Sequence, residues 1–426
     1  MNNKILSVVV LVCRCFVVAV VCVAVAGFWS ASAFAARGHV FDGSFASQGS
    51  GPGQLQEPSG VAVNEATHTV YVLDGGNNRV ERFSTTGVFL GQFDGSGEYE
   101  IEGKIVKDKV AGSGGGEDEI ETGRLAEPAG ESPSGIAVDD SCSLRKLAGA
   151  ACTSADPSNG DVYVLDLGHK VVDKFAPNGE YVGQITTKSV RVASFEDLTG
   201  IAVDEMGEVW LSEKHPAPPD PSNFYTGVGV DRLSNGLVNL FASFVSTGGS
   251  GAAGGLPGLA INSAHDFYRL ITKGAHLEIV EYNQSGVVLN EEVLEASSGK
   301  SGVKEFVAGM TVDPCSEDLY VEEFSALVRL DAGGALLESV AIPGGRGSGV
   351  AVDCSAQTVY VLDPVDGKVL VAPPEPPGAP TVEVGSDSVS DVTSDAATLL
   401  GGINPRSEPG EAATEYRFEY GRCVSL

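Results

Sequence analysis

Short apolar and alternating runs recur along most of the chain, and each is bounded by Gly, Pro, Asn or Asp. The recurring unit opens with glycine, continues with an apolar, a small and an apolar residue, and ends with Asp or Asn. The unit starts at Gly60, Gly135, Gly200, Gly258, Gly309 and Gly349. A second run follows each copy and ends at Asp74, Asp166, Glu213, Thr272, Glu323 and Asp363 in turn. Runs of this length between turn residues predict β-strands.

Each copy continues with a third run, as at 79–83 and 171–175, and often with a fourth, as at 87–93 and 179–185. Four short strands per repeat, six times over, predict an all-β fold, a six-bladed β-propeller. The small residue in the first strand suits a position near a crowded axis, packed between neighbouring blades. A two-sheet sandwich is the alternative all-β fold, but it does not explain one motif that recurs six times.

The two ends of the repeat region predict how the ring closes. The last copy stops after residue 372 and lacks its fourth strand. Residues 38–45, "GHVFDGSF", match the fourth-strand sequence "GVFLGQF" and have no copy of their own. We therefore expect the N-terminal strand to complete the last blade, which removes the exposed edges of an open array.

The first copy, "GQLQEPSGVAVN…TVYVLDGGNNRVERFSTTGVFLGQF", resembles an NHL repeat, and the resemblance covers residues 38–372. Copies three to five lack the Gly-Asn-Asn-Arg turn found at 76–79 but keep the strand pattern. The overall style is similar to secreted NHL proteins of high-GC actinobacteria. The resemblance also implies possible chemistry, because some six-bladed relatives are lactonases or hydrolases with Ca²⁺ in the channel. The peptide-amidating lyases, in turn, resemble NHL rings with a His-ligated metal.

The N-terminal residues 1–35 have the pattern of a secretory signal peptide. Lys4 and Arg14 supply positive charge before the apolar run at 15–28. Ala33 and Ala35 give a small-x-small cleavage pattern. The alternative is an uncleaved N-terminal anchor. We expect a secreted or cell-surface protein with no stable membrane span after cleavage.

The propeller is expected to span 36–372, followed by a Pro-rich linker at 373–380. Residues 381–426 alternate like strands of a fibronectin type III or Ig-like domain, which they resemble. They supply about half of such a domain, an incomplete β-sandwich-like tail that cannot bury a proper core alone.

Charge and cysteine usage narrow the possible partners. Without residues 1–35, the chain has 25 basic and 57 acidic side chains, which gives a net charge of −32. Such a chain repels nucleic acid, so no nucleic-acid partner is expected. The sequence has no CxxC motif and no Cys/His cluster, so no zinc site is predicted.

Two pairs of cysteines are candidates for disulfides. Cys142 and Cys152 bracket one loop, and we predict that they pair after export. Cys315 and Cys354 lie in equivalent turns of adjacent repeats, where either a bridge or free thiols are possible. Cys423 has no evident partner in the sequence.

The uneven lengths between copies point to one functional face. In a propeller, the loops between blades and the loops between second and third strands open on the same side. The long insertions at 94–132, 215–226 and 246–258 fall there. Long loops on a rigid scaffold are where binding sites usually lie.

Five carboxylates end their second strands on that face: Asp74, Asp166, Glu213, Glu323 and Asp363. Oxygen ligands around a central opening could hold Ca²⁺. The competing interpretation is that each carboxylate caps its own turn. This interpretation is favoured because acidic residues recur at this position of the repeat.

No catalytic constellation is visible, so no catalytic, cofactor-binding or metal-binding residue is assigned. The histidines are His39, His68, His169, His215, His265 and His276, and they occupy different parts of the repeat. No GxSxG elbow is present. We expect a non-enzymatic scaffold that binds a protein or glycan through its loop-rich face. The alternatives are a Ca²⁺-dependent hydrolase or lyase and an architectural spacer of a longer surface protein.

Overall fold

The computed structural model describes residues 38–375 with gaps at 97, 102–103, 108–124, 126–134, 148–157, 186–197, 215–227, 234–238, 246–257, 274–275, 295–308, 324 and 346, and the segments 381–383, 389–390, 398–399 and 402–404. The chain divides into two compact units. Gly38–Pro374 forms the larger one. Residues 1–35, including the expected signal peptide, lie outside the described residues. Among the described helices, none has the length and apolar character that crossing a membrane requires.

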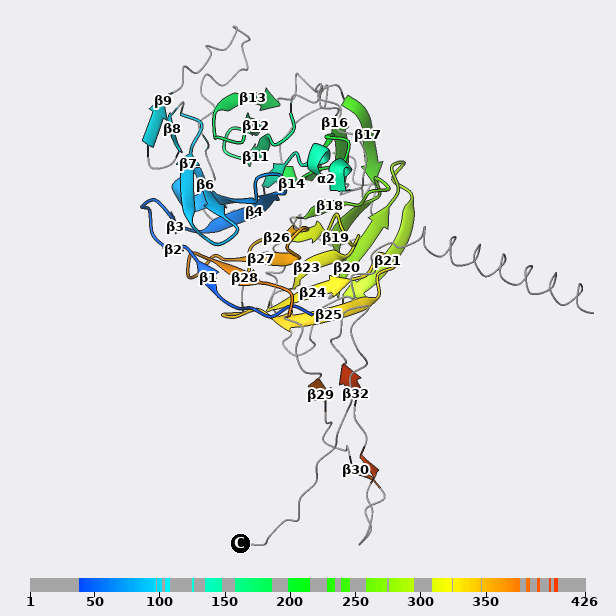
Figure 1. The fold of residues 1–426 in the computed structure, drawn as a ribbon. Helices are drawn as coiled ribbons and strands as arrows, with labels where there is room; N and C mark the ends of the chain where they lie inside the picture. The colour runs from blue at the N-terminus through cyan, green and yellow to red at the C-terminus, as the bar shows by residue number, and fades with distance from the viewer. Residues whose placement is uncertain are drawn as a thin grey trace, which may run out of the picture. The chain divides into compact units, whose positions relative to one another are not determined.

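Gly38–Pro374 is an all-β propeller with five four-stranded antiparallel sheets (Figure 1). Their strands, sheet by sheet, are β10 (Ile136–Val138), β11 (Val162–Asp166), β12 (Val171–Phe175) and β13 (Tyr181–Ile185); β14 (Leu198–Val203), β15 (Val209–Lys214), β16 (Val228–Leu233) and β17 (Asn239–Val245); β18 (Leu259–Ile261), β19 (Phe267–Lys273), β20 (His276–Tyr282) and β21 (Val288–Leu294); β22 (Met310–Val312), β23 (Leu319–Glu323), β24 (Ala326–Leu330) and β25 (Leu336–Ala341); and β26 (Val350–Asp353), β27 (Thr358–Asp363), β28 (Lys368–Ala372) and β1 (Ser44–Phe45).

The sheet of the first copy departs from the expected four strands. It has six, in the order β4-β5-β6-β7-β8-β9. Its strands are β4 (Pro58–Asn64), β5 (Thr69–Asp74), β6 (Arg79–Ser84), β7 (Phe89–Phe93), β8 (Glu98–Ile101) and β9 (Lys104–Lys107). The last two come from the insertion at 94–132, for which a loop was predicted. Its stretch "EYEI" pairs with the free edge of β7, and "KIVK" pairs in turn with "EYEI".

The core lies between sheets. The first strands contact one another in sequence order from β4 to β26, and β26 contacts β4. Each pair of neighbouring sheets encloses an apolar cluster. An aromatic side chain occupies the same position of every second strand and is buried: Tyr71, Tyr163, Trp210, Tyr268, Tyr320 and Tyr360. This arrangement explains why the second strands are apolar on both faces.

The predicted ring closure is confirmed. Strand β1 pairs antiparallel with β28, with Ser44 opposite Leu370 and Phe45 opposite Val369. In Figure 1 the blue N-terminal strand lies beside the orange β28. The last copy therefore takes its missing outer strand from the start of the folded region.

Few other elements interrupt the sheets. Strands β2 (Ser47–Gln48) and β3 (Gln54–Leu55) form a small parallel pair. A 3-10 turn, η1 (Gly75–Asn77), follows β5. Helix α2 (Ser141–Leu147) lies in the segment that the sequence analysis treated as a loop, with Arg145 and Lys146 in its last turn, where basic side chains are favourable.

The C-terminal segments are β29 (Thr381–Glu383), β30 (Val389–Ser390), β31 (Thr398–Leu399) and β32 (Gly402–Asn404). They form two short antiparallel pairs, β29 with β32 and β30 with β31. The Ig-like or fibronectin-like interpretation of residues 381–426 stays a prediction.

Candidate functional site

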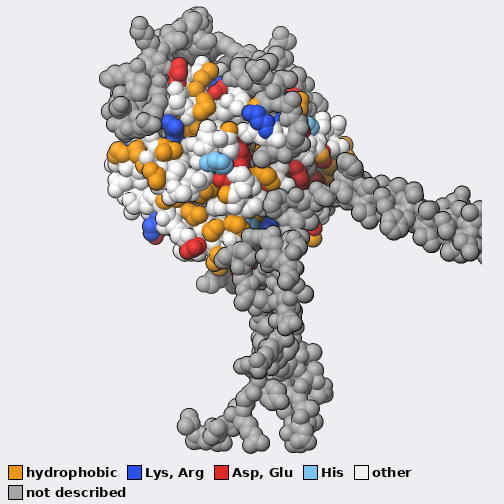
Figure 2. Space-filling view, viewed as in Figure 1, with side chains coloured by type: hydrophobic (Ala, Val, Ile, Leu, Met, Phe, Trp, Pro, Cys, Tyr) orange, Lys and Arg blue, Asp and Glu red, His pale blue; other side chains and the backbone are white. Residues whose placement is uncertain are grey.

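The ring has two faces that use their carboxylates differently. We call the face at the ends of the second strands, with residues 74, 166 and 363, the loop face. The opposite face carries the turns between first and second strands, with residues 64–69, 204–208, 262–266, 313–318 and 353–358, and we call it the turn face. Figure 2 shows acidic side chains and histidine close together near the middle of the ring in that view.

On the loop face, the predicted carboxylates act within their own turns. The Asp363 carboxylate accepts the N–H groups of Val365 and Asp366 at 3.1 Å. Asp166 accepts the N–H of His169 at 2.9 Å and contacts its Nδ1 at 2.8 Å. These contacts support the turn-cap interpretation at both positions. The side chains of Glu213 and Glu323 lie outside the described part of the structure.

Asp74 belongs to a buried charge cluster rather than a simple cap. Arg79 lies between two carboxylates, with Nε 2.9 Å from Asp74 Oδ2 and Nη2 2.7 Å from Glu81 Oε1. Asp74 also accepts the N–H of Gln56 at 2.6 Å and the Asn77 amide at 2.7 Å. Burial raises the pKa of Asp74, and these hydrogen bonds oppose the rise. The guanidinium thus compensates two carboxylates that are fully shielded from water.

The second repeat keeps both carboxylates but not the arginine. Asp166 and Asp173 are fully buried, and Val171 stands opposite Asp166 in the sheet. Among the described residues, the Tyr181 hydroxyl lies 3.5 Å from Asp173 Oδ1, and Gln184 stands opposite Asp173 in the sheet and also hydrogen-bonds with it. Burial, followed by the charge of Asp166, raises the pKa of Asp173 to about 8.

On the turn face, polar contacts run from each repeat to the next and back to the first. We call this set the turn belt. In ring order its contacts are Glu65 N to Asp140 Oδ2 (3.1 Å), Arg145 Nε to Glu205 O (3.1 Å), His265 Nδ1 to Asp204 Oδ2 (3.1 Å), Ser263 N to Glu317 Oε2 (3.1 Å), Gln357 Nε2 to Asp313 Oδ2 (3.0 Å) and Cys354 N to Glu65 Oε1 (2.6 Å). Side chains here therefore hold neighbouring sheets together.

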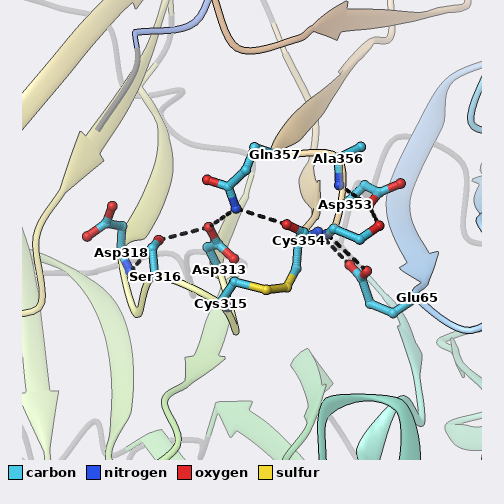
Figure 3. The surroundings of a disulfide bond; sticks show 10 residues. Glu65, Asp313, Cys315, Ser316, Asp318, Asp353, Cys354, Ala356 and Gln357 are labelled. Atoms are coloured by element: carbon cyan, nitrogen blue, oxygen red, sulfur yellow. Dashed lines mark hydrogen bonds between the residues drawn. A yellow bond between two sulfur atoms is a disulfide. The ribbon is translucent and has the colours of Figure 1, made fainter. Parts of the chain in front are cut away.

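A disulfide strengthens the belt between the last two repeats (Figure 3). Cys315 and Cys354 are joined, with Cα atoms 5.6 Å apart, within the range that a disulfide tolerates. The bridge settles the alternative left open by the sequence. The Asp313 carboxylate and the two sulfurs lie within 4.8 Å of one another, but joined sulfurs offer no thiolate to a metal.

Glu65 is the centre of the belt at the ring closure. Figure 3 shows its carboxylate directed at the backbone of Cys354, and Ser355 N lies 3.4 Å from its second oxygen. Burial raises the pKa of Glu65 to about 7; the two N–H donors oppose this, and Asp353 and Asp313 add to it. Burial also raises the pKa of Asp140 well above its ordinary value, and the charge of Glu65 contributes. These raised pKa values mean that the belt holds its carboxylates at an electrostatic cost.

The described histidines have structural partners. His39 contacts Glu338 Oε2 at 2.9 Å through Nδ1 and holds the N-terminal segment against β25. His68 Nδ1 lies 3.6 Å from Asp353 Oδ2, and His265 belongs to the belt. His215 and the side chain of His276 lie outside the described residues.

The predicted Cys142–Cys152 disulfide is not settled by the described residues. Cys142 is buried in α2, and Cys152 lies in the undescribed segment 148–157. The pairing stays a prediction.

Three residues that distinguish the two faces were not predicted from the sequence: Glu65, Asp140 and Asp173. Glu65 and Asp140 each follow the Asn or Asp that ends a first strand, so both occur at one repeat position. Asp173 stands at the position of Glu81, two residues beyond the place where arginine gives way to valine. Comparing charges position by position between repeats could have identified Asp173.

Comparisons with known proteins agree with the repeat pattern. The model of the NHL repeat matches residues 55–83. No curated protein matches the chain in sequence.

Solved structures show backbone similarity at low identity. A gluconolactonase from Xanthomonas campestris is 16% identical, with a TM-score of 0.44, 75% of this chain covered and 86% of that one. The calcium-binding protein regucalcin from Agrobacterium tumefaciens is 12% identical, with a TM-score of 0.44 and coverages of 78% and 93%. Virginiamycin B lyase from Staphylococcus aureus is 10% identical, with a TM-score of 0.44 and coverages of 75% and 95%. At this level of similarity none of them assigns a reaction or a ligand. The chain is an all-β propeller that carries an NHL repeat in its first copy.

Proposed function

We propose that the chain is a secreted or cell-surface six-bladed propeller that binds a protein or glycan ligand through its loop face. The sheet β4–β9 counts as the sixth blade, with β8 and β9 added at its outer edge. The closed sequence of contacts among the first strands supports this count. The Cys315–Cys354 bridge supports export, because disulfides persist in oxidising compartments.

The turn belt is the observation that carries this function. Its contacts join each repeat to the next on the turn face, so that face serves to hold the ring together. Recognition is left to the loop face, where the repeat pattern varies and the long insertions begin. A rigid ring with variable loops on one face is a common design for binding proteins.

Exchange of one loop-face turn tests the proposal. Ligands are selected on the full chain from a peptide library and a glycan array. Residues 167–170 are then replaced by the Gly-Gly-Asn-Asn turn of residues 75–78, which has the same length. Binding should fall in this variant and persist in the turn-face control Glu317→Gln. Ligands lost only in the control, or no ligand at all, would contradict a loop-face binding function.

A metal-dependent hydrolase or lyase is the second candidate. The buried Asp166–Asp173 pair favours it, because burial and the charge of Asp166 raise the pKa of Asp173, and carboxyl groups with raised pKa values are common general acids and bases. Thermal unfolding of the full chain with Ca²⁺ and with EDTA tests this candidate, since a ligand of the native state raises its stability. Equal melting temperatures at millimolar Ca²⁺ would count against a Ca²⁺-dependent enzyme.

A further inference from the structure

The disulfide of the turn belt lies beside a third group that can bind a metal. The Sγ atoms of Cys315 and Cys354 and a carboxylate oxygen of Asp313 lie within 4.8 Å of one another (Figure 3). Asp313 and Cys315 belong to the turn after β22, whereas Cys354 belongs to the equivalent turn after β26. Because the group combines two repeats, it leaves no CxxC spacing in the sequence.

Hydrogen bonds hold the Asp313 carboxylate in place and join it to the second turn. Its Oδ1 accepts the N–H of Cys315 at 2.9 Å, and its Oδ2 accepts the Ser316 hydroxyl at 2.8 Å. Gln357 Nε2 donates to the same Oδ2 at 3.0 Å and to the Cys354 carbonyl at 2.9 Å. The Gln357 side chain therefore ties the two turns together without the disulfide. A carboxylate oxygen has two lone pairs, so Oδ1 keeps one for a metal.

Two further contacts keep the cysteines adjacent when the bridge is open. The Cys354 N–H donates to Glu65 Oε1 at 2.6 Å. The first strands β22 and β26, which lead into the two turns, also contact each other. Breaking the sulfur–sulfur bond therefore leaves Cys315 and Cys354 as neighbours.

The two sulfurs differ in exposure, and this difference fixes how a reductant reaches the bond. Cys315 is exposed, whereas Cys354 is 2% exposed. A thiolate of a dithiol reductant therefore attacks Cys315 Sγ, and Cys354 leaves as the thiolate. The second thiol of the reductant attacks the reductant's own sulfur in the mixed disulfide and releases Cys315. The chain gains two electrons and two protons, and the reductant becomes a disulfide.

We propose that Asp313 and the reduced pair Cys315 and Cys354 form a Zn²⁺ site, which replaces the disulfide as the clamp between the last two repeats. The two thiol protons pass to solvent, and two thiolates, one carboxylate oxygen and water hold the ion. Sulfurs at about 2.3 Å from a tetrahedral ion stand about 3.8 Å apart, which rotation of the exposed Cys315 side chain allows. The same dithiol exists on the new chain before the bridge first forms.

The charge around the sulfurs suits a dication. Three buried carboxylates lie around the bridge in Figure 3: Glu65, Asp313 and Asp353. Among the described residues, the ion pair of this group is that of Asp353 with His68 Nδ1, at 3.6 Å. Thiolate ligands favour Zn²⁺ over Ca²⁺ and Mg²⁺. The exposed side of Cys315 gives the ion and its water a path from solvent.

Titration of the full chain with ZnCl₂ tests the site. One sample is reduced with tris(2-carboxyethyl)phosphine and freed of reductant without air, and the other is kept oxidised. We expect the reduced chain to bind one Zn²⁺ that the oxidised chain does not bind. Cys315→Ser should lose this ion, whereas Cys423→Ser, which removes a thiol outside the group, should keep it. Co²⁺ is the optical probe, because a sulfur-to-metal charge-transfer band requires thiolate ligands.

Asp313→Asn tests the third ligand, since asparagine keeps the size of the side chain and removes its charge. It should weaken Zn²⁺ binding by more than about tenfold, a loss found even for groups that only orient a ligand. Asp353→Asn is the matched control. Asp353 lies at the same position of the next repeat and also caps its own turn, through the N–H of Ala356 at 2.9 Å. This variant should weaken binding less than Asp313→Asn does.

Three results would overturn the inference: equal Zn²⁺ binding by the oxidised and reduced chains, binding kept in Cys315→Ser, or an equal loss in Asp313→Asn and Asp353→Asn. If Asp313→Asn fails to fold, Cys315→Ser still decides, because it changes an exposed side chain. The inference concerns the turn face and does not rest on the proposed function. Ligands of the loop face are selected on the oxidised chain, so the two can fail separately.

Discussion

The two faces of the ring place similar carboxylates at similar repeat positions and use them for different purposes. On the turn face, Glu65 and Asp140 reach into the neighbouring repeat and bind its backbone. On the loop face, Asp166 and Asp363 bind the turn that directly follows their own strand. The turn-face carboxylates Glu65 and Asp140 therefore connect repeats, whereas Asp166 and Asp363 on the loop face stabilise their own turns. Changes on the turn face should weaken the ring as a whole, while changes on the loop face should act within one sheet.

Removal of the disulfide should produce the largest effect on the turn face. Cys315→Ala with Cys354→Ala opens a bridge between residues 39 positions apart, and we expect a loss of about 4 kcal/mol in the free energy of unfolding. Urea denaturation of oxidised protein measures it. The double alanine variant of Cys142 and Cys152, whose predicted loop is shorter, should lose less. An equal or larger loss of unfolding free energy in the Cys142/Cys152 variant would contradict the prediction that the Cys315–Cys354 bridge stabilises the protein more.

Arg79→Val makes the first repeat resemble the second on the loop face. It leaves Asp74 and Glu81 buried without their cation, which should destabilise the protein by about 3 kcal/mol. The low end of the usual range applies because the Arg79 side chain is 11% exposed. The matched control is Lys368→Val, at the equivalent place in the last sheet, where both partners of the ion pair are exposed. That control should lose less than about 1 kcal/mol in the same urea titration. Similar losses in both variants would show that the buried cluster has no special role.

Glu65→Gln should change how stability depends on pH. The pKa of Glu65 is about 7 in the folded protein and 4.5 ordinarily, so the folded state holds its proton more tightly. Its contribution to stability is therefore complete below pH 4.5 and is lost as the pH rises toward 7. The expected loss over this window is about 2–3 kcal/mol, and Glu65→Gln should remove it.

The measurement is the free energy of unfolding at several pH values for wild type and Glu65→Gln. The exposed Glu180 provides the control Glu180→Gln, which should keep the wild-type slope. Parallel curves for wild type and Glu65→Gln would mean that the Glu65 contact carries no pH dependence.

A single polar contact of the belt should have the smallest effect. His265→Asn removes the contact with Asp204 and should cost about 1 kcal/mol. Asparagine tolerates the left-handed backbone at His265, where φ is 60°. His68→Asn is matched, since His68 has φ of 51° and a side chain that is 54% exposed. It should change the melting temperature little, and an equal change in both variants would argue against the belt.

Much of the fold follows from the sequence because it depends on periodicity. The glycine-led motif located every first strand, and the unmatched segment 38–45 predicted the pairing of β1 with β28. Periodicity says less about insertions, which is why β8, β9 and α2 were not foreseen.

The site was harder to predict, since a repeat position does not say which way a side chain reaches. Asp166 ends strand β11 and Glu65 directly follows strand β4, yet Asp166 binds its own turn and Glu65 binds the neighbouring sheet. The difference depends on the distance between sheets, which a single sequence does not encode locally. Asp173 was missed for another reason. Its environment differs from that of Glu81 because the second repeat has Val171 at the position of Arg79.

The pairing of Ser44 with Leu370 also sets an order in time. Strand β1 emerges first during synthesis or export, but its partner is made more than 300 residues later. Closing a loop of that length is slow, because its entropy must be lost before any contact across it forms. Until then the last sheet keeps an open edge at β28 and β1 has no partner, and open edges are the surfaces on which repeat proteins misassemble. The finished ring therefore forms only after the last repeat has arrived, and a chain that stops short of β28 leaves β1 without a partner.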